Sequence, residues 1–241
     1  MTKMLASVKC VAEAMIALEL GADIIDLKNP HSGALGALPT ITLREIVTAI
    51  DGQRSISATI GDLPNDSGAL KNNILATAAS GVDIVKIGVA SRTEMDNIIE
   101  VRNAIGQSIS TQFVAVLFAD KSWELDWISR FANAGFFGVM LDTAGKSAGN
   151  LRQHIDAHRL GEFVWHARKQ RLLCGLAGSL RVDDISALLA HNPDYLGFRG
   201  ALCADHSRIA QLEPHAFASV RDRIPFEFSS LEVRDHAPVE L

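Results

Sequence analysis

The sequence predicts an α/β fold, a single (β/α)8 barrel of the TIM type, and two observations carry this prediction. Eight short apolar runs, rich in β-branched residues, are each followed by a longer stretch with helical spacing. From the second run onward their centres recur about every 25–35 residues, enough for a strand, a turn and a helix. Nearly continuous apolar runs are typical of parallel strands covered on both faces. The 241 residues therefore accommodate eight such units in one domain.

The expected strands and helices alternate along the chain. The strands are expected at Met4–Val8, Asp23–Leu27, Ser55–Ile60, Ile84–Val89, Phe113–Phe118, Gly138–Asp142, Leu172–Leu176 and Tyr195–Phe198. The helices are expected at Val11–Leu20, Leu43–Ile50, Ser67–Ser80, Glu94–Ile105, Trp123–Ala134, Leu151–Lys169, Asp183–Ala190 and Ser207–Val220.

The domain boundaries follow from the same pattern. No linker rich in Pro, Ser or Gly interrupts the chain, so residues 1–220 are expected to form one barrel. Residues 221–241 contain two prolines and no helical period, which predicts a C-terminal tail. A doubly wound open sheet is the main alternative fold. The G-x-G-x-x-G motif that would favour a dinucleotide-binding sheet is absent.

Composition narrows the classes of function. Hydrophobic residues make up 48% and charged residues 21% of the chain, which favours a folded core over a disordered chain. The net charge of −5 provides no general field for nucleic acid or anionic lipid. Three dispersed cysteines predict reduced thiols. Without a signal sequence or an apolar run of about 18 residues, we expect a cytoplasmic protein with no membrane span.

Charged residues stand at the carboxyl ends of the expected strands, where barrels place their active sites. Lys28, Lys86, Asp142 and Arg199 end the second, fourth, sixth and eighth runs. Because alternate strands build each interior layer, we expect these four in one layer, with Asp26 one layer deeper. An ion-pair network that only fixes the barrel mouth is the alternative interpretation. Burying several charges is costly, which favours a functional cluster.

A lysine beside other cations in a dry pocket has its pKa lowered and can act as a nucleophile. Such an amine forms a carbinolamine and then an imine with an aldehyde or ketone. Asp26, Asp142 and Lys146 are the candidate proton carriers.

Two glycine-rich turns predict a phosphate site. Gly178–Ser179 follows the seventh run, and Arg199-Gly200-Ala201 follows the eighth, where barrels commonly bind phosphate with backbone N–H groups.

The sequence evidence for a metal site is weaker than that for a phosphate site. One helix face carries His154, His158, Glu162 and His166, but the outer face of a barrel helix is exposed, so we predict no metal site.

Six ordered segments resemble the (5-formylfuran-3-yl)methyl phosphate synthase family, which makes the furan precursor of methanofuran. They are Asp23–Pro30 with Gly33–Gly36, Ser57–Pro64, Asp83–Gly88, Met140–Lys146, Leu176–Ser179 and Gly197–Ala201. The first strand and the C-terminal tail depart from the family pattern.

The resemblance implies a barrel lyase that converts two glyceraldehyde 3-phosphate molecules into 4-(hydroxymethyl)-2-furancarboxaldehyde phosphate, releasing phosphate and water, without a cofactor. The family's imine-forming lysine falls on Lys28, and its other active-site residues fall on Lys86, Asp142, Lys146 and Asp26. Two substrates imply two phosphate pockets, and the loop from Asn29 to Gly36 is a candidate for the second.

Two other functions remain open from the sequence. An imine-forming aldolase could use the same lysine on another phosphorylated aldehyde without releasing phosphate. A non-catalytic sugar-phosphate sensor could use the lysines only to bind phosphate. For the favoured function the expected partner is a small phosphorylated triose, and the sequence does not decide whether the protein forms a homo-oligomer.

Overall fold

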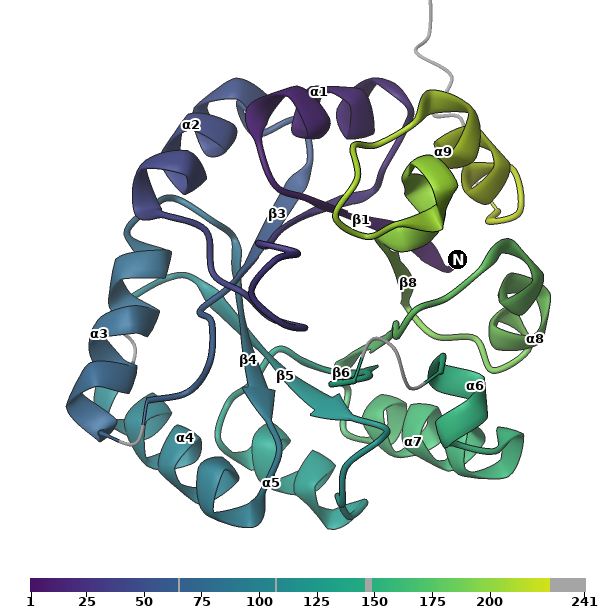
Figure 1. The fold of residues 1–241 in the computed structure, drawn as a ribbon. Coiled ribbons are helices and arrows are strands. Elements are labelled where there is room, and N and C mark those ends of the chain that lie inside the picture. Colours follow the sequence, from purple (N-terminus) through teal and green to yellow (C-terminus); the bar gives the residue numbers. More distant parts are fainter. Residues whose placement is uncertain (65, 107, 146–148, 226–241) are drawn as a thin grey trace, which may run out of the picture.

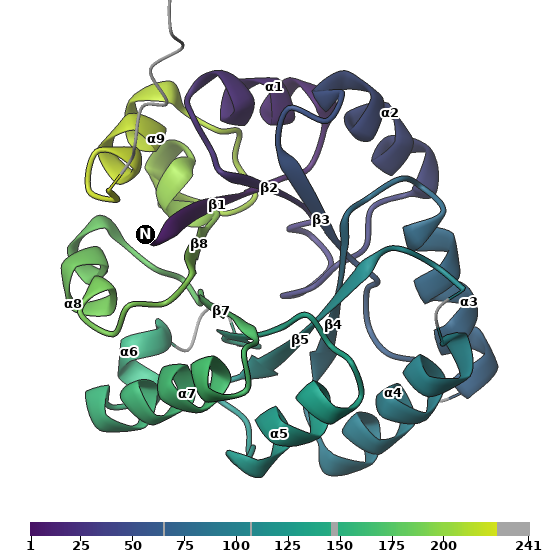
Figure 2. The ribbon, with the colours of Figure 1, turned by 180° about the vertical axis from the view of Figure 1, so that it is seen from behind.

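Eight parallel strands form a closed barrel in which each strand pairs with the next in chain order, and β8 pairs with β1. The computed structural model describes residues 1–225, apart from residues 65, 107 and 146–148. Helices surround the barrel on all sides (Figure 1), and the view from behind shows the same ring (Figure 2). The predicted (β/α)8 barrel is confirmed.

The strands lie where the apolar runs predicted them, with ends that differ by at most one residue. Their bounds are β1 Lys3–Val8, β2 Ile24–Leu27, β3 Ser55–Thr59, β4 Ile84–Val89, β5 Gln112–Phe118, β6 Gly138–Asp142, β7 Leu173–Leu176 and β8 Tyr195–Phe198.

The α-helices of the described residues follow the strands. They are α1 Val11–Glu19, α2 Thr40–Ile50, α3 Ser67–Ala78, α4 Arg92–Ile105, α5 Asp126–Asn133, α6 Leu151–His154, α7 Ala157–Lys169, α8 Ile185–Leu189 and α9 Pro214–Arg221. Short 3₁₀ helices span Val182–Asp184, Gly200–Leu202 and Ala204–His206. No helix in these ranges is long and apolar enough to cross a membrane.

Two helix predictions were wrong in extent. The expected helix Leu151–Lys169 is two helices, because Asp156 begins the second by accepting a hydrogen bond from the Arg159 amide at 2.8 Å. The expected helix Ser207–Val220 begins only at Pro214, because Cys203 and Leu212 pair as an isolated β-bridge before it. The segment 203–213 therefore runs as an irregular excursion between β8 and α9. Of the predicted tail, residues 226–241 lie outside the described residues.

The apolar core has two layers. A large layer lies between the outer face of the barrel and the helices, and a smaller one fills the barrel interior around Leu5, Ile84, Val114 and Tyr195. A Cβ atom at position 175 would overlap the phenol ring of Tyr195, so glycine there makes room for the ring. The barrel is thus plugged by apolar side chains, and polar groups gather above the plug.

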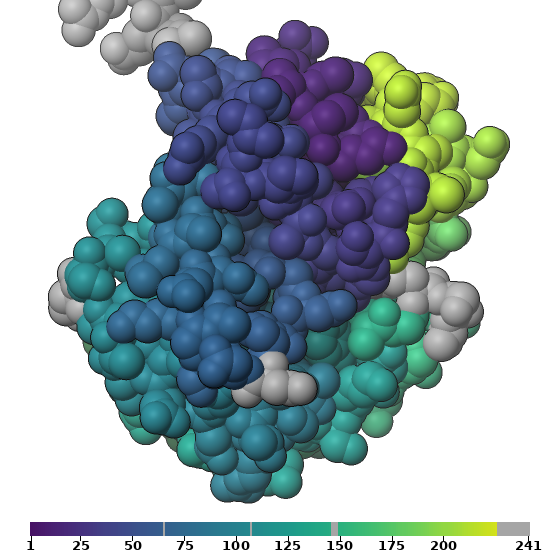
Figure 3. Space-filling model, turned by 60° about the vertical axis from the view of Figure 1, so that its left-hand side comes forward, coloured from purple at the N-terminus to yellow at the C-terminus, as the bar shows by residue number. Residues whose placement is uncertain are grey.

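The loop after β2 crosses the open end of the barrel (Figure 1). Its Leu35 is buried against Gly88 and Phe118, and the amide of Asn29 donates to the carbonyl oxygen of Gly36 at 2.8 Å. The atoms of this loop adjoin those of the segment after β8 in Figure 3. There Arg208 Nη2 donates to the carbonyl oxygen of Gly33 at 2.7 Å. The mouth is therefore narrowed by two loops that touch each other.

Candidate active site

Asp26 lies on β2 at the centre of a buried polar cluster. Its Oδ1 lies 2.9 Å from Lys86 Nζ on β4, and its Oδ2 lies 3.8 Å from Lys28 Nζ. Asp26 is fully buried and Lys86 is 2% exposed. One carboxylate therefore lies within ion-pair distance of two lysine side chains.

The register corrects the predicted layering. Asp26 pairs with Ser57, and Ser57 pairs with Ile84. In a barrel of this kind, residues at the same height shift by one position from each strand to the next. From β2 to β4 the shift is two positions, from Ile84 to Lys86, so Lys86 lies in the same layer as Asp26. Lys28 lies one layer above, at the mouth. The alternation of side chains along a strand shows which residues point inward, but not the stagger between strands.

Hydroxyl groups complete the environment of Asp26. Ser7 Oγ donates to Oδ2 at 3.0 Å and Ser57 Oγ donates to Oδ1 at 2.7 Å. Burial alone would raise the pKa of Asp26, but the attraction of Lys86 and Lys28 and the hydrogen bonds from Ser57 and Lys86 outweigh it. The pKa of Asp26 is therefore lowered, and the carboxylate is ionised at neutral pH.

Lys28 and Asp142 line a cavity of about 140 Å³ at the mouth of the barrel. Lys28 is 7% exposed, and Asp142 is buried and accepts the Thr143 amide at 2.7 Å. The predicted phosphate residues Gly178, Ser179, Gly200 and Ala201 line the same cavity. The structure thus brings the strand-end charges and both glycine-rich turns together.

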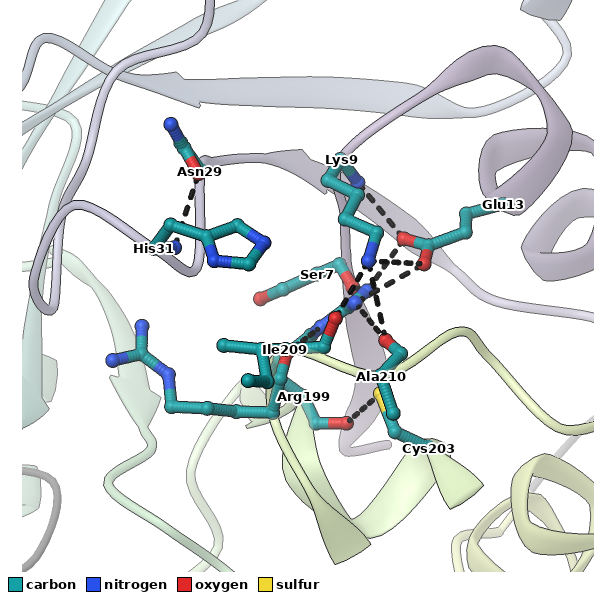
Figure 4. Close-up of polar contacts among 10 residues, drawn as sticks. Ser7, Lys9, Glu13, Asn29, His31, Arg199, Cys203, Ile209 and Ala210 are labelled. Carbon is teal, nitrogen blue, oxygen red and sulfur yellow. Dashed lines mark hydrogen bonds and ion pairs between the residues drawn. The ribbon is translucent and has the colours of Figure 1, made fainter.

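Arg199 does not point its guanidinium into this cavity, although it lines the wall. Nη1 and Nη2 contact both carboxylate oxygens of Glu13 on α1 (Figure 4), with Nη2 3.1 Å from Oε1. Its remaining hydrogen bonds go to the carbonyl oxygens of Ser7, Arg208 and Ala210. The prediction that Arg199 shares an interior layer with Lys28, Lys86 and Asp142 is therefore wrong. The buried partner Glu13 satisfies its charge and directs it away from the lumen.

Asn29 was predicted to help form a second phosphate pocket, and the structure places it at the start of the loop after β2. Its Oδ1 accepts the His31 amide at 3.0 Å (Figure 4), and its Nδ2 donates to Ser32 Oγ at 3.2 Å. Asn29 is not among the residues that line the cavity. Its side chain shapes the first turn of the loop that crosses the mouth.

Arg208 is a cavity residue that sequence reasoning missed. It is half-buried and lines the cavity with Lys28 and Asp142, and its guanidinium donates to the carbonyl oxygen of Gly33. Burial lowers the pKa of Arg208, partly offset by the nearby Asp142 carboxylate. Arg208 follows no apolar run, and only its basic character in an irregular segment could have drawn attention to it.

Lys146 lies outside the described residues, but the segment leading to it is held in place. Asp120, at the end of β5, accepts the amide of Ala144 at Oδ1 and that of Gly145 at Oδ2, both at 2.7 Å. Burial tends to raise the pKa of Asp120, but these two N–H groups lower it overall. Sequence reasoning missed this residue too.

The histidines and the glutamate for which no metal site was predicted lie on two helices, His154 on α6 and His158, Glu162 and His166 on α7. There His158 Nδ1 lies 3.7 Å from Glu162, on an exposed surface. Over the parts of the chain that the structure describes, no three His, Cys, Asp or Glu side chains gather as a metal site would require.

Comparisons with known proteins identify the family. A model of the family described as 4-HFC-P synthase matches residues 4–221. A Methylorubrum extorquens protein, provisionally named a (5-formylfuran-3-yl)methyl phosphate synthase, is 41% identical over 88% of this chain and 86% of its own length. The Methanopyrus kandleri (5-formylfuran-3-yl)methyl phosphate synthase is 36% identical over 79% of this chain and 85% of its own length.

A solved structure supports the fold independently of sequence. Phosphoribosyl anthranilate isomerase from Thermus thermophilus superposes with a TM-score of 0.67 at 12% identity, covering 92% of this chain and 98% of the isomerase. Identity at that level supports the barrel alone. The family match and the two relatives agree with the resemblance carried by the six sequence motifs, and the chain belongs to the 4-HFC-P synthase family.

Proposed function

We propose that the protein condenses two glyceraldehyde 3-phosphate molecules into 4-(hydroxymethyl)-2-furancarboxaldehyde phosphate, with loss of phosphate and water, for methanofuran or a methanofuran-like coenzyme. One observation carries the proposal: Lys28 lies in the mouth cavity directly above the buried Asp26–Lys86 pair. The names of the relatives support the product.

Lys28 is the proposed nucleophile because of the two amines it is the one that lines the cavity. Lys86 Nζ lies 2.9 Å from Asp26 below the cavity, and Lys28 Nζ lies 3.8 Å from the same carboxylate. The neutral amine of Lys28 attacks the aldehyde carbon of one triose, and loss of water gives an imine. Asp26 and Lys86 are placed below it to exchange protons.

The imine provides the electron sink for the next steps. It acidifies the adjacent C–H bond, and removal of that proton allows the C–O bond to phosphate to break, with the electron pair leaving on phosphate. The second triose, isomerised toward its ketone form, adds in an aldol step. Ring closure and dehydration then give the furan, and hydrolysis of the imine releases its aldehyde and regenerates the Lys28 amine. Asp142, buried at the same cavity, is a further proton carrier.

Phosphate binding is assigned to the turns after β7 and β8. Gly178, Ser179, Gly200 and Ala201 line the cavity with small side chains, which let the backbone approach an anion closely. Gly178 has φ +113, and a Cβ there would lie 2.9 Å from Thr143 Cγ2, so a larger residue would also disturb the end of β6. Arg208 supplies the guanidinium that was expected from Arg199.

Incubation of the protein with glyceraldehyde 3-phosphate tests the proposal directly. Mass spectrometry should identify the furan-aldehyde phosphate, and inorganic phosphate should rise by one for every two trioses consumed. Lys28→Arg should abolish both, because a guanidinium remains protonated and cannot attack a carbonyl. Lys169→Arg, on the exposed end of α7, is the matched control and should retain activity.

Borohydride trapping separates the alternatives. Reduction during turnover should attach a triose-derived mass to wild-type protein at Lys28. An adduct without phosphate release would favour an aldolase acting on another phosphorylated aldehyde. Binding of triose phosphate by both wild type and Lys28→Arg, with neither adduct nor product, would favour a sugar-phosphate sensor and refute the imine mechanism.

A further inference from the structure

The segment after β8 that carries Arg208 is held through its backbone by two cationic side chains. Lys9 directly follows β1 and Arg199 directly follows β8, and these two strands are paired neighbours in the barrel. Arg199 Nε donates to the carbonyl oxygen of Arg208 at 2.7 Å, and its Nη2 donates to that of Ala210 at 2.7 Å. One end of each contact therefore stands on the rigid rim of the barrel.

Lys9 makes the remaining contacts with this segment. Its Nζ donates to the carbonyl oxygen of Ile209 at 2.7 Å and to that of Ala210 at 3.5 Å (Figure 4). The same Nζ lies 3.8 Å from Glu13 Oε1. Lys9 is half-buried and is not among the described residues that line the cavity containing Lys28. Lys9 thus contacts the segment but not the site of the proposed reaction.

The position of this backbone decides where the Arg208 side chain stands. Residues 208–210 belong to no helix or strand, so their course depends on contacts from side chains such as Lys9. From this backbone the guanidinium of Arg208 reaches the carbonyl oxygen of Gly33 and lines the cavity. A shift of the backbone would displace the guanidinium, and a displacement of about 1 Å is enough to weaken the action of a positioned group.

Removal of Lys9 and removal of Arg199 have different consequences for the buried charges. Both terminal nitrogens of Arg199 contact the Glu13 carboxylate, so loss of Arg199 leaves a buried carboxylate without its main counter-charge. Loss of the Lys9 ammonium group leaves the pair of Glu13 and Arg199 in place. Lys9 is therefore the residue through which the hold on the segment is tested without breaking the buried pair.

We propose that Lys9 is a positioning residue for Arg208: its ammonium group holds the backbone at residues 209–210, so that the guanidinium of Arg208 stands at the cavity before a triose phosphate binds. The inference rests on the proposed function, because it takes Arg208 as a ligand of the substrate phosphate. Lys9 does not touch the substrate and acts on binding only through Arg208. Holding a binding group in place in advance increases affinity by lowering the cost of ordering it.

Steady-state kinetics of Lys9→Met tests the proposal. Methionine keeps most of the apolar stem and removes the ammonium group. KM for glyceraldehyde 3-phosphate should rise about three- to tenfold, with kcat nearly unchanged, since a charge-assisted hydrogen bond at a partly exposed position is lost. Lys9→Arg keeps a charged donor and should restore KM to near the wild-type value. Lys3→Met, exposed at the opposite end of β1, removes the same charge and is the matched control.

The double variant Lys9→Met, Arg208→Met separates positioning from other effects. If Lys9 acts through Arg208, its substitution should add nothing to the KM of Arg208→Met. An equal rise of KM in both backgrounds would overturn the proposal, because Lys9 would then act on the substrate by another route. An unchanged KM in the single variant Lys9→Met would overturn it as well.

Hydrogen exchange without substrate tests the hold on the segment apart from the reaction. The amide of Ala210 donates to the carbonyl oxygen of Ser207 at 3.0 Å, within a peptide spanning 203–213. This peptide should exchange faster in Lys9→Met than in wild type and Lys3→Met. Equal exchange in the three proteins would overturn the proposal. If the wild type makes no furan product, the proposed function fails on its own, and the Kd for glyceraldehyde 3-phosphate takes the place of KM in the same comparisons.

Discussion

Arg208 reaches from the segment after β8 to the loop after β2, where its Nη2 donates to the carbonyl oxygen of Gly33 at 2.7 Å. The same side chain lines the cavity that contains Lys28 and Asp142. One residue therefore ties two loops together across the mouth and presents a guanidinium to the cavity where we propose that phosphate binds.

Replacing Arg208 should weaken substrate binding. Arg208→Met keeps most of the apolar volume but removes the charge, and should raise KM for glyceraldehyde 3-phosphate about 10–100-fold, since charge-assisted hydrogen bonds contribute about 1.5–3 kcal/mol. Steady-state kinetics measures the change. Arg223→Met, exposed beyond α9, is the matched control. An unchanged KM in Arg208→Met would exclude the phosphate role.

The buried ion pair between Glu13 and Arg199 should matter for stability. Glu13→Gln leaves a buried guanidinium without its counter-charge, which should lower the free energy of unfolding by about 3–5 kcal/mol in urea titrations. The double variant Glu13→Gln, Arg199→Met should lose less unfolding free energy than the sum of the losses in the two single variants, because the two residues interact directly. If Arg199→Met instead unfolds like the wild type but raises KM, Arg199 binds substrate.

The gathering of Lys28 and Asp142 at the mouth of the barrel was predictable from the sequence. Lys28 and Asp142 stand where apolar runs end, and a barrel brings all such ends to one rim. The height of Lys86 in the barrel interior was not predictable, because it depends on the stagger between strands. The orientation of the Arg199 side chain was not predictable either, since its partner Glu13 lies 186 residues away in the chain. Arg208 lies in a segment without periodicity, so no pattern placed it.

Asp26 should contribute to stability in a pH-dependent way. Its folded-state pKa is lowered, because the lysines and hydrogen bonds outweigh the effect of burial. The stabilisation is therefore complete above the pKa of the unfolded state and is lost as the pH falls through the folded-state pKa.

The difference in unfolding free energy between wild type and Asp26→Asn measures this contribution. It should stay constant from neutral pH down to about pH 4, the ordinary value for aspartate, and should shrink below it. Urea titrations at a series of pH values give the curve. If burial raised the pKa of Asp26 instead, wild type would gain stability relative to Asp26→Asn as the pH falls, and the gain would begin well above pH 4.

Asp120 should affect turnover rather than binding. Its two oxygens accept the amides of Ala144 and Gly145 at 2.7 Å, in the segment that leads to Lys146. Asp120→Asn replaces one acceptor with an NH₂ donor, so one of the two amides loses its partner. Because Asp120 is not among the residues lining the Lys28 cavity, KM should stay nearly constant. The kcat should fall about tenfold if the segment positions a proton carrier, an effect of the size expected from misplacing such a group. Asp222→Asn, exposed after α9, controls for the general effect of removing one negative charge. A rise in KM with constant kcat would show that the segment binds substrate without taking part in proton transfer.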